Sequence, residues 1–189
     1  MRSLALATLL AVLNTNADAL ERDVRNGLEY VGGIYGSILA HEVGHALTAK
    51  AFDATDIRIK IPREGIFDGV TTFNHPRGLS SEQGQVFSIA GLVSANVIGE
   101  LVIQRKGLHR SPFSRSLVGT ALVSNVIHVV SYYTKVRGRK GYQGNDIDAF
   151  ELSGGNPHML SAGLLAYTAW SLSRASKKQI PLFGVQVQF

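Results

Sequence analysis

The stretch ILAHEVGHALTAKAF, residues 38–52, places two histidines and a glutamate inside an otherwise apolar run. Polar side chains in such a setting are costly unless they have partners or bind a ligand. His41 and His45 are four residues apart, so on a helix they project from one face, one turn apart, and can share a metal ion. Glu42 lies beside that face. The stretch therefore predicts a helix with a metal-binding face.

This HExxH arrangement is typical of zinc hydrolases, in which the two imidazoles bind the metal and the glutamate takes a proton from the attacking water. The other interpretation is a pair of buried histidines satisfied by hydrogen bonds. Because the chain has no cysteine, any metal must be held by nitrogen and oxygen ligands. We expect Zn²⁺ as the cofactor, His41 and His45 as ligands and Glu42 as the general base.

A zinc hydrolase needs a third protein ligand. Thr48 and Ala51 stand where a metzincin requires glycine and histidine, which excludes that class. Glu100, in a later apolar segment, is one candidate and would indicate a soluble or peripheral zinc peptidase. The stretch GYQGNDIDAFE, residues 141–151, offers Asp146 and Asp148 as the others. The spacing alone does not decide which of Glu100, Asp146 and Asp148 is the third ligand.

The composition of the chain favours a membrane protein. Hydrophobic residues make up 45% of the chain and charged residues 17%, below the usual quarter. Four apolar segments, approximately 27–52, 86–103, 116–134 and 159–173, are rich in the small and branched residues that let membrane helices approach closely. We expect a mainly α polytopic membrane bundle of about four helices, with membrane lipid as a partner. A soluble domain with buried core helices is the alternative.

The N-terminus is typical of an export signal. Arg2 precedes the apolar run Leu4–Leu13, and Ala17-Asp18-Ala19 supplies small residues for cleavage. Ten apolar residues are too few for a bilayer, which takes about 20 in a helix. We therefore predict a signal peptide over residues 1–19 and a single membrane-embedded domain over residues 20–189. An amphipathic first helix that stays on the protein is the alternative.

The segment after the HExxH stretch has strand periodicity. TDIRIKI, residues 55–61, alternates isoleucines with charged side chains, and GIFDGVTTF, residues 65–73, supplies a second β-prone run. We predict a β-hairpin between Thr55 and Phe73 whose exposed edge binds an extended peptide, with proline at Ile57 or Ile59 as its test. The net charge is +5, but no basic stripe interleaved with aromatic residues is found, so no nucleic acid is expected as a partner.

Three pieces together resemble the site-2 protease family of intramembrane zinc metalloproteases. They are HEVGHAL at residues 41–47, AFDA at residues 51–54 leading into the hairpin, and AGLVSAN at residues 90–96. The resemblance implies a zinc-dependent endopeptidase that acts on membrane-associated or transmembrane protein substrates. It also implies that Asn96 lies near the active site and binds substrate. An interhelical hydrogen bond is the other interpretation of Asn96.

The resemblance further implies that an aspartate on a later segment is the third zinc ligand. The NxxP and LDG sequences of the family are not present here, since Ile147 follows Asp146 and Ala149 follows Asp148. Asp146 is preferred, because Gly144-Asn145-Asp146 resembles the glycine-polar-aspartate sequence of the shorter family members. The other aspartate is then a carboxylate at a helix start, where negative charge is favourable.

Two further alternatives concern His128 and the protein as a whole. His128 lies within the third apolar segment, where it is either a buried neutral histidine bonded to a neighbouring helix or a group that contacts the site or the substrate. A non-catalytic membrane protein with a structural zinc is the third class of function. In that case replacing Glu42 would leave the biological role intact.

Overall fold

The computed structural model of the chain describes residues 2–62, 69–134 and 145–182, and only the backbone of residues 2–19. Its elements are α1 (Arg2–Ala51), β1 (Thr55–Lys60), β2 (Val70–Asn74), α2 (Ser81–Gln104), the 3₁₀ turn η1 (Leu108–Arg110), α3 (Pro112–Thr134), α4 (Asp146–Leu152) and α5 (Pro157–Lys177). The prediction of a mainly helical chain with a small hairpin after the HExxH helix is confirmed. The four apolar segments lie in α1, α2, α3 and α5, and the short helix α4 was not predicted.

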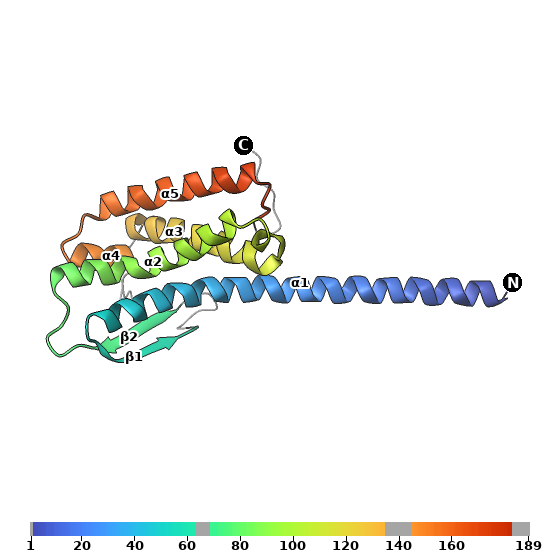
Figure 1. Cartoon of the computed structure of the whole chain (residues 1–189), viewed down its shortest axis with the longest axis horizontal. Coiled ribbons are helices and arrows are strands. Elements are labelled where there is room, and N and C mark those ends of the chain that lie inside the picture. Colours follow the sequence, from blue (N-terminus) through green and yellow to red (C-terminus); the bar gives the residue numbers. More distant parts are fainter. Residues whose placement is uncertain (1, 63–68, 135–144, 183–189) are drawn as a thin grey trace.

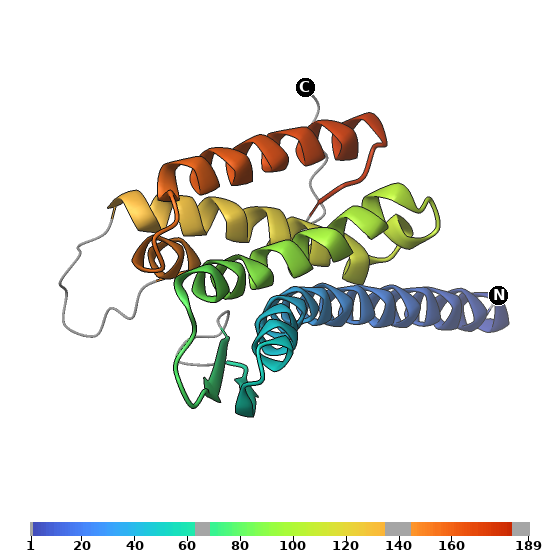
Figure 2. The ribbon, with the colours of Figure 1, turned by 60° about the vertical axis from the view of Figure 1, so that its left-hand side comes forward.

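The helices form a compact body from which the first half of α1 extends (Figure 1). Helices α2, α3 and α5 lie beside one another, and the second half of α1 packs against α2 and α3. The hairpin lies at the C-terminal end of α1, and α4 contacts α2, α3 and α5 (Figure 2). The C-terminal end of α1, the hairpin and the start of α4 are thereby brought to one end of the body.

Two helices, α2 and α3, are long and apolar enough to cross a membrane by length and composition. Both expose large apolar side chains that do not line the cavity described below, which are Val93, Val97 and Leu101 on α2 and Val126 and Val130 on α3. Apolar surface of this extent needs a cover of lipid or protein. Over residues 2–62, 69–134 and 145–182, two helices are thus candidate spans, fewer than the four helices expected from the sequence.

Helix α1 runs without a break through the expected cleavage site after residue 19. It ends where Asp53 adopts a left-handed conformation with φ of 61° and the N–H of Ala54 donates to the carbonyl of Ala49 at 3.0 Å. This is a usual way to terminate a helix and reverse the chain. The turn directs the following hairpin back along α1, so that β2 passes beside Glu42.

The two strands pair antiparallel, with Ile59 opposite Thr71 and Lys60 opposite Val70. The pairing is irregular between Thr55 and Arg58. The hairpin therefore forms where the alternating pattern predicted it.

Close contact between α1 and α2 depends on Gly44. A Cβ atom at this position would lie 2.4 Å from the carbonyl oxygen of Ala90 and 2.6 Å from the Cβ of Ser94. Only a glycine permits such an approach, as at other points where two helix backbones meet. Since Gly44 lies between His41 and His45 in sequence, this contact places the histidine-bearing part of α1 directly on α2.

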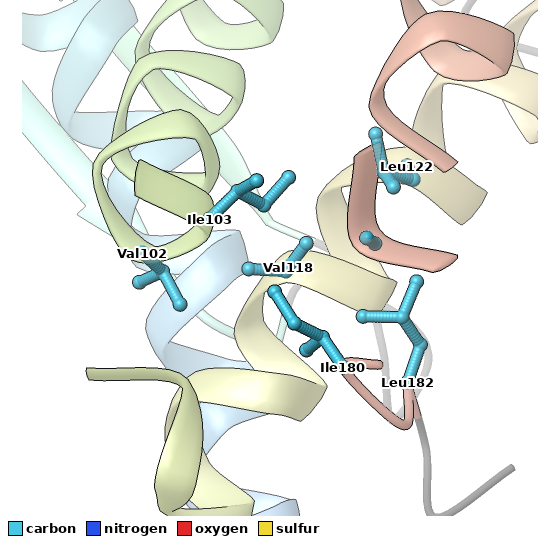
Figure 3. Close-up of a cluster of buried hydrophobic side chains, with 7 residues drawn as sticks. Val102, Ile103, Val118, Leu122, Ile180 and Leu182 are labelled. Atoms are coloured by element: carbon cyan, nitrogen blue, oxygen red, sulfur yellow. The ribbon is translucent and has the colours of Figure 1, made fainter. Parts of the chain in front are cut away.

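Two clusters of buried side chains hold the body together. The first joins the ends of α2 and α3 to the C-terminal segment and consists of Val102, Ile103, Val118, Leu122, Ala175, Ile180 and Leu182 (Figure 3). The second joins α2, α3, α4 and α5 and consists of Leu92, Val129, Tyr132, Ile147 and Leu164. Ile147 is fully buried, so it anchors α4 immediately beside Asp146.

Candidate metal centre

His41 and His45 project from one face of α1, as their spacing predicts. Their Nε2 atoms are 3.1 Å apart, and the two rings meet edge to face with centres separated by 4.8 Å. The Nδ1 atom of His45 lies 2.8 Å from the backbone carbonyl oxygen of Phe87 on α2. Because a carbonyl only accepts hydrogen bonds, Nδ1 carries the proton and Nε2 keeps its lone pair. This is the tautomer in which a histidine binds a metal through Nε2.

Asp146, the first residue of α4, completes the cluster. One carboxylate oxygen, Oδ2, lies 3.0 Å from Nε2 of His41, and the other, Oδ1, lies 3.4 Å from Nε2 of His45. Within the described part of the chain, these three side chains are the one group whose ligand atoms come close enough to hold a metal ion, within 4.8 Å of one another. The structure therefore brings together the three residues that were predicted as ligands.

The start of α4 is fixed by its N-cap residue, Asn145. The side-chain oxygen of Asn145 accepts hydrogen bonds from the backbone N–H groups of Ile147 and Asp148. Its side-chain nitrogen donates to the carbonyl oxygen of His128 on α3, at 2.8 Å. Because one side chain caps α4 and ties it to α3, the carboxylate of Asp146 is held in place opposite the histidines.

The distances within the cluster fit a zinc ion. Ligand atoms about 2.0–2.1 Å from a tetrahedral zinc lie about 3.3–3.4 Å from one another. The two Nε2 atoms are 3.1 Å apart, and each lies 3.0–3.4 Å from a different oxygen of Asp146, while one ligand atom from each residue gives a group within 4.8 Å. The Oδ2 atom of Asp146 is buried, yet it receives no hydrogen bond. A buried carboxylate oxygen without a hydrogen bond needs another positive partner, and two imidazoles and a carboxylate are suitable zinc ligands.

The carboxyl group of Asp146 is ionised at neutral pH. Burial by itself raises the pKa of Asp146, but the neighbouring His41 and His45 outweigh burial and leave that pKa well below its ordinary value. A carboxyl that loses its proton this readily is suited to binding a cation.

The two other candidate carboxylates have different partners. Asp148 accepts a hydrogen bond from the backbone N–H of Asn145 at 2.8 Å and completes the capping box of α4. Glu100 forms an ion pair with Arg174 on α5 and accepts a hydrogen bond from Gln104 at 2.8 Å. Neither carboxylate belongs to the histidine cluster. The alternative in which Glu100 is the third ligand therefore has no support in this arrangement.

Glu42 is buried and lines the same cavity as the three ligands. The hydroxyl of Thr71 on β2 lies 2.7 Å from Oε2 of Glu42 and 3.0 Å from its backbone carbonyl oxygen, and it donates to these acceptors. A Cβ at Gly69 would lie 2.7 Å from Cγ of Glu42. The hairpin thus fixes the orientation of the Glu42 carboxylate, a role for Thr71 and Gly69 that no pattern in the sequence indicated.

A cavity of about 630 Å³ surrounds the cluster. It is bounded by α1, β2, α2, α3 and α4, and its walls include the apolar side chains Ile34, Ile38, Val123 and Ile127. A cavity of this size can take an amino-acid side chain together with part of a peptide backbone. The arrangement therefore combines a metal-binding cluster, a buried carboxylate and space for an apolar ligand.

Asn96 lies away from the cluster. Its side chain exchanges two hydrogen bonds with Asn125 on α3, at 3.0 and 3.1 Å, and Asn125 also donates to Thr168 on α5 at 3.1 Å. Asn96 is not among the residues that line the cavity. This arrangement is the interhelical hydrogen bond considered above, and no contact in the structure supports the predicted role of Asn96 in substrate binding.

The close fit of both imidazoles against α2 depends on Gly91. A Cβ there would lie 2.4 Å from Nε2 of His45 and 2.6 Å from Nε2 of His41. We therefore expect Gly91→Ala to displace the histidines and weaken zinc binding by at least ~10-fold, the lower range for a displaced ligand. Zinc titration of the purified protein measures this. Gly163→Ala on α5, where a Cβ meets nothing within 4 Å, is the control, and wild-type zinc affinity in Gly91→Ala would contradict the geometry.

Comparison of this chain with family models, with curated proteins and with solved structures finds no match. The functional argument therefore rests on the geometry of the site.

Proposed function

We propose that this protein is a zinc-dependent endopeptidase of the site-2 protease type, which hydrolyses peptide bonds of membrane-associated or transmembrane proteins. The observation that carries the proposal is the convergence of His41, His45 and Asp146 on one point of a cavity that also holds the buried Glu42. HExxH spacing occurs by chance, but a third ligand that reaches both histidines from a segment about 100 residues away is not a consequence of that spacing.

The chemistry follows from the residues that line the cavity. Zinc, when bound, supplies a Lewis acid and makes a water molecule acidic enough to react at neutral pH. Glu42 accepts the proton of the attacking water and returns it to the leaving amine. Thr71 holds one oxygen of Glu42 by its hydrogen bond and leaves the second oxygen to exchange the proton.

The proposed location is a membrane, with α1, α2, α3 and α5 forming a multi-pass bundle. The support is the length and apolarity of α2 and α3, together with the large apolar side chains that these helices expose. In a bilayer, backbone polar groups must be paired within the protein, and a substrate helix has all of its carbonyls paired. The substrate must therefore be unwound before cleavage.

Strand β2 is the part of the hairpin that can hold an unwound substrate. Val70 and Thr71 of β2 line the cavity, whereas no residue of β1 does so. Since β1 already pairs with one edge of β2, the other edge of β2 is open to an added strand. The proposed binding edge is therefore β2, within the predicted hairpin, whereas Ile57 and Ile59, the positions chosen from the sequence to test it, lie on β1.

Removal of the metal tests the proposed activity. The protein is reconstituted in liposomes with a model transmembrane peptide, and cleavage is measured before and after treatment with a zinc chelator. We expect cleavage to stop on chelation and to return when Zn²⁺ is added back, because the metal activates the nucleophile. Cleavage that continues in the fully chelated protein would contradict a zinc-dependent reaction.

Proline scanning of β2 tests the binding edge. Successive N–H groups of a strand point to opposite edges, so one of Thr72→Pro and Phe73→Pro removes a donor from the open edge. We expect that variant to lose cleavage by ~10-fold or more while keeping its zinc, because one or two backbone hydrogen bonds contribute about 1–2 kcal/mol. The alanine variants at both positions control for the side chains, and Ile57→Pro and Ile59→Pro test β1. Proline variants of β2 that match their alanine counterparts would contradict strand addition there.

A further inference from the structure

His128 on α3 lines the same cavity as His41, His45 and Asp146, as in the second of the two interpretations that the sequence left open for it. Its Nδ1 atom lies 2.8 Å from the backbone carbonyl oxygen of Ser124, one turn earlier. Because the carbonyl only accepts, Nδ1 is the protonated nitrogen, and the neutral ring presents the lone pair of Nε2 to the cavity. His45 is held in the same way by the carbonyl of Phe87 at 2.8 Å. A backbone carbonyl that fixes the ring in this tautomer is a usual feature of metal-binding histidines.

The Nε2 atom of His128 faces an atom that also has no proton to give. It lies 3.5 Å from Oδ2 of Asp146, and that oxygen is buried without a hydrogen bond. Two ligand atoms about 2.0–2.1 Å from one tetrahedral zinc lie about 3.3–3.4 Å apart, so this separation fits two ligands of the same ion. The separation of 3.5 Å is close to the 3.0 and 3.4 Å between Asp146 and the two ligand histidines.

The ring of His128 lies beside that of His41 at a spacing that suits two ligands of one ion. The ring of His128 stacks on that of His41, with centres 5.7 Å apart, and the centres of His41 and His45 are 4.8 Å apart. Two imidazoles bound to one tetrahedral zinc have ring centres separated by about 5 Å. His128 therefore approaches the cluster from α3, while His41 and His45 approach it from α1 and Asp146 from α4.

We propose that His128 is a fourth protein ligand of the metal, through Nε2, so that the centre consists of three imidazoles and one carboxylate. The inference rests on the proposed metal site, and it does not depend on peptide cleavage. His128 contacts the start of α4 in two ways. Its side chain faces Asp146, and its backbone carbonyl accepts the hydrogen bond from Asn145 that fixes the first residue of α4. With four protein ligands, water joins the ion only as a fifth ligand, an expansion that catalytic zinc sites permit.

X-ray absorption at the zinc edge tests this ligand set, because scattering from imidazole rings reports how many histidines bind the ion. We expect three imidazoles in the full-length wild-type protein loaded with Zn²⁺ and two in His128→Ala, with zinc affinity lowered by at least ~10-fold in the variant. His109→Ala, in the 3₁₀ turn η1, is the matched control and should keep three. Two imidazoles in the wild type would overturn the proposal even if His128→Ala failed to fold, and so would three imidazoles in a folded His128→Ala.

The outcomes separate this inference from the proposed peptidase. A zinc centre with two imidazoles, in a protein whose cleavage of the model peptide needs Glu42, would overturn the role of His128 and leave the peptidase standing. A zinc centre with three imidazoles in a protein that cleaves nothing would uphold the ligand set and overturn the peptidase. Failure of the wild type to bind zinc at all would overturn both.

Discussion

Glu42→Gln should keep its zinc and its fold while losing peptide cleavage by at least ~100-fold, the usual contribution of a general base. The reason is that Glu42 lies on the cavity beside the ligands without belonging to the metal-binding group. Glutamine has nearly the same shape and can still accept the hydrogen bond of Thr71, but it cannot take a proton from water. Zinc content, thermal unfolding and cleavage of a transmembrane peptide in liposomes are measured on the same preparation.

The control for Glu42→Gln is Glu82→Gln, which makes the same chemical change at an exposed position in the first turn of α2. Loss of zinc from Glu42→Gln would mean that Glu42 is a ligand and that the assigned roles are wrong. A biological role that survives the substitution intact would favour the alternative of a membrane protein with a structural zinc.

Local sequence periodicity was enough to predict the helix that carries His41 and His45 and the hairpin beside it, but not the short helix α4 that carries Asp146. The four-residue spacing of His41 and His45 needs only the pitch of a helix, and the alternation in TDIRIKI needs only the period of a strand. The first helix is longer than predicted, because the segment was divided into a signal peptide and an apolar helix. The chain contains no proline before Pro62, so nothing in its first 51 residues forces a helix to end.

Contacts between distant segments could not be read from periodicity. The bond from Thr71 to Glu42 joins residues 29 positions apart, and the fit of Gly91 against two imidazoles depends on how α1 and α2 pack. His128 could be placed on a helix, but its proximity to Asp146 depends on the path of the chain between them. Such positions are set by packing of the whole body, which a one-dimensional pattern does not specify.

A local sequence pattern does distinguish Asp146 from Asp148. Asn145 and Asp148 have the spacing of a capping box, in which the residue at the helix start and the one three positions later bond to each other's backbone. The structure contains both bonds. A carboxylate used in this way is engaged at the helix start, which favours Asp146 as the proposed ligand. The family resemblance favoured the same residue for a different reason.

Asp146→Ala should therefore remove most of the bound zinc, whereas Asp148→Ala should not. A substitution that only displaces a ligand lowers metal affinity by ~10–100-fold, so loss of the ligand itself should lower it by more than ~100-fold. Asp148→Ala instead removes one bond of the capping box and should cost about 1 kcal/mol of stability with the zinc retained. Metal analysis after dialysis against a weak chelator, together with thermal unfolding, distinguishes the two effects.

Glu100→Gln provides a third arm of this experiment, because it breaks the ion pair with Arg174 on α5 without touching the histidine cluster. It should keep its zinc and change only stability. If zinc is lost in Asp148→Ala and kept in Asp146→Ala, the ligand is Asp148. Helix α4 would then have to be rotated about its axis relative to this structure, so that Asp148 and not Asp146 faces the histidines. If zinc survives both aspartate substitutions and is lost in Glu100→Gln, the third ligand comes from α2. The protein would then belong with the soluble or peripheral zinc peptidases, because the carboxylate that completes the site would lie on the helix next to the HExxH helix and not on the segment after α3.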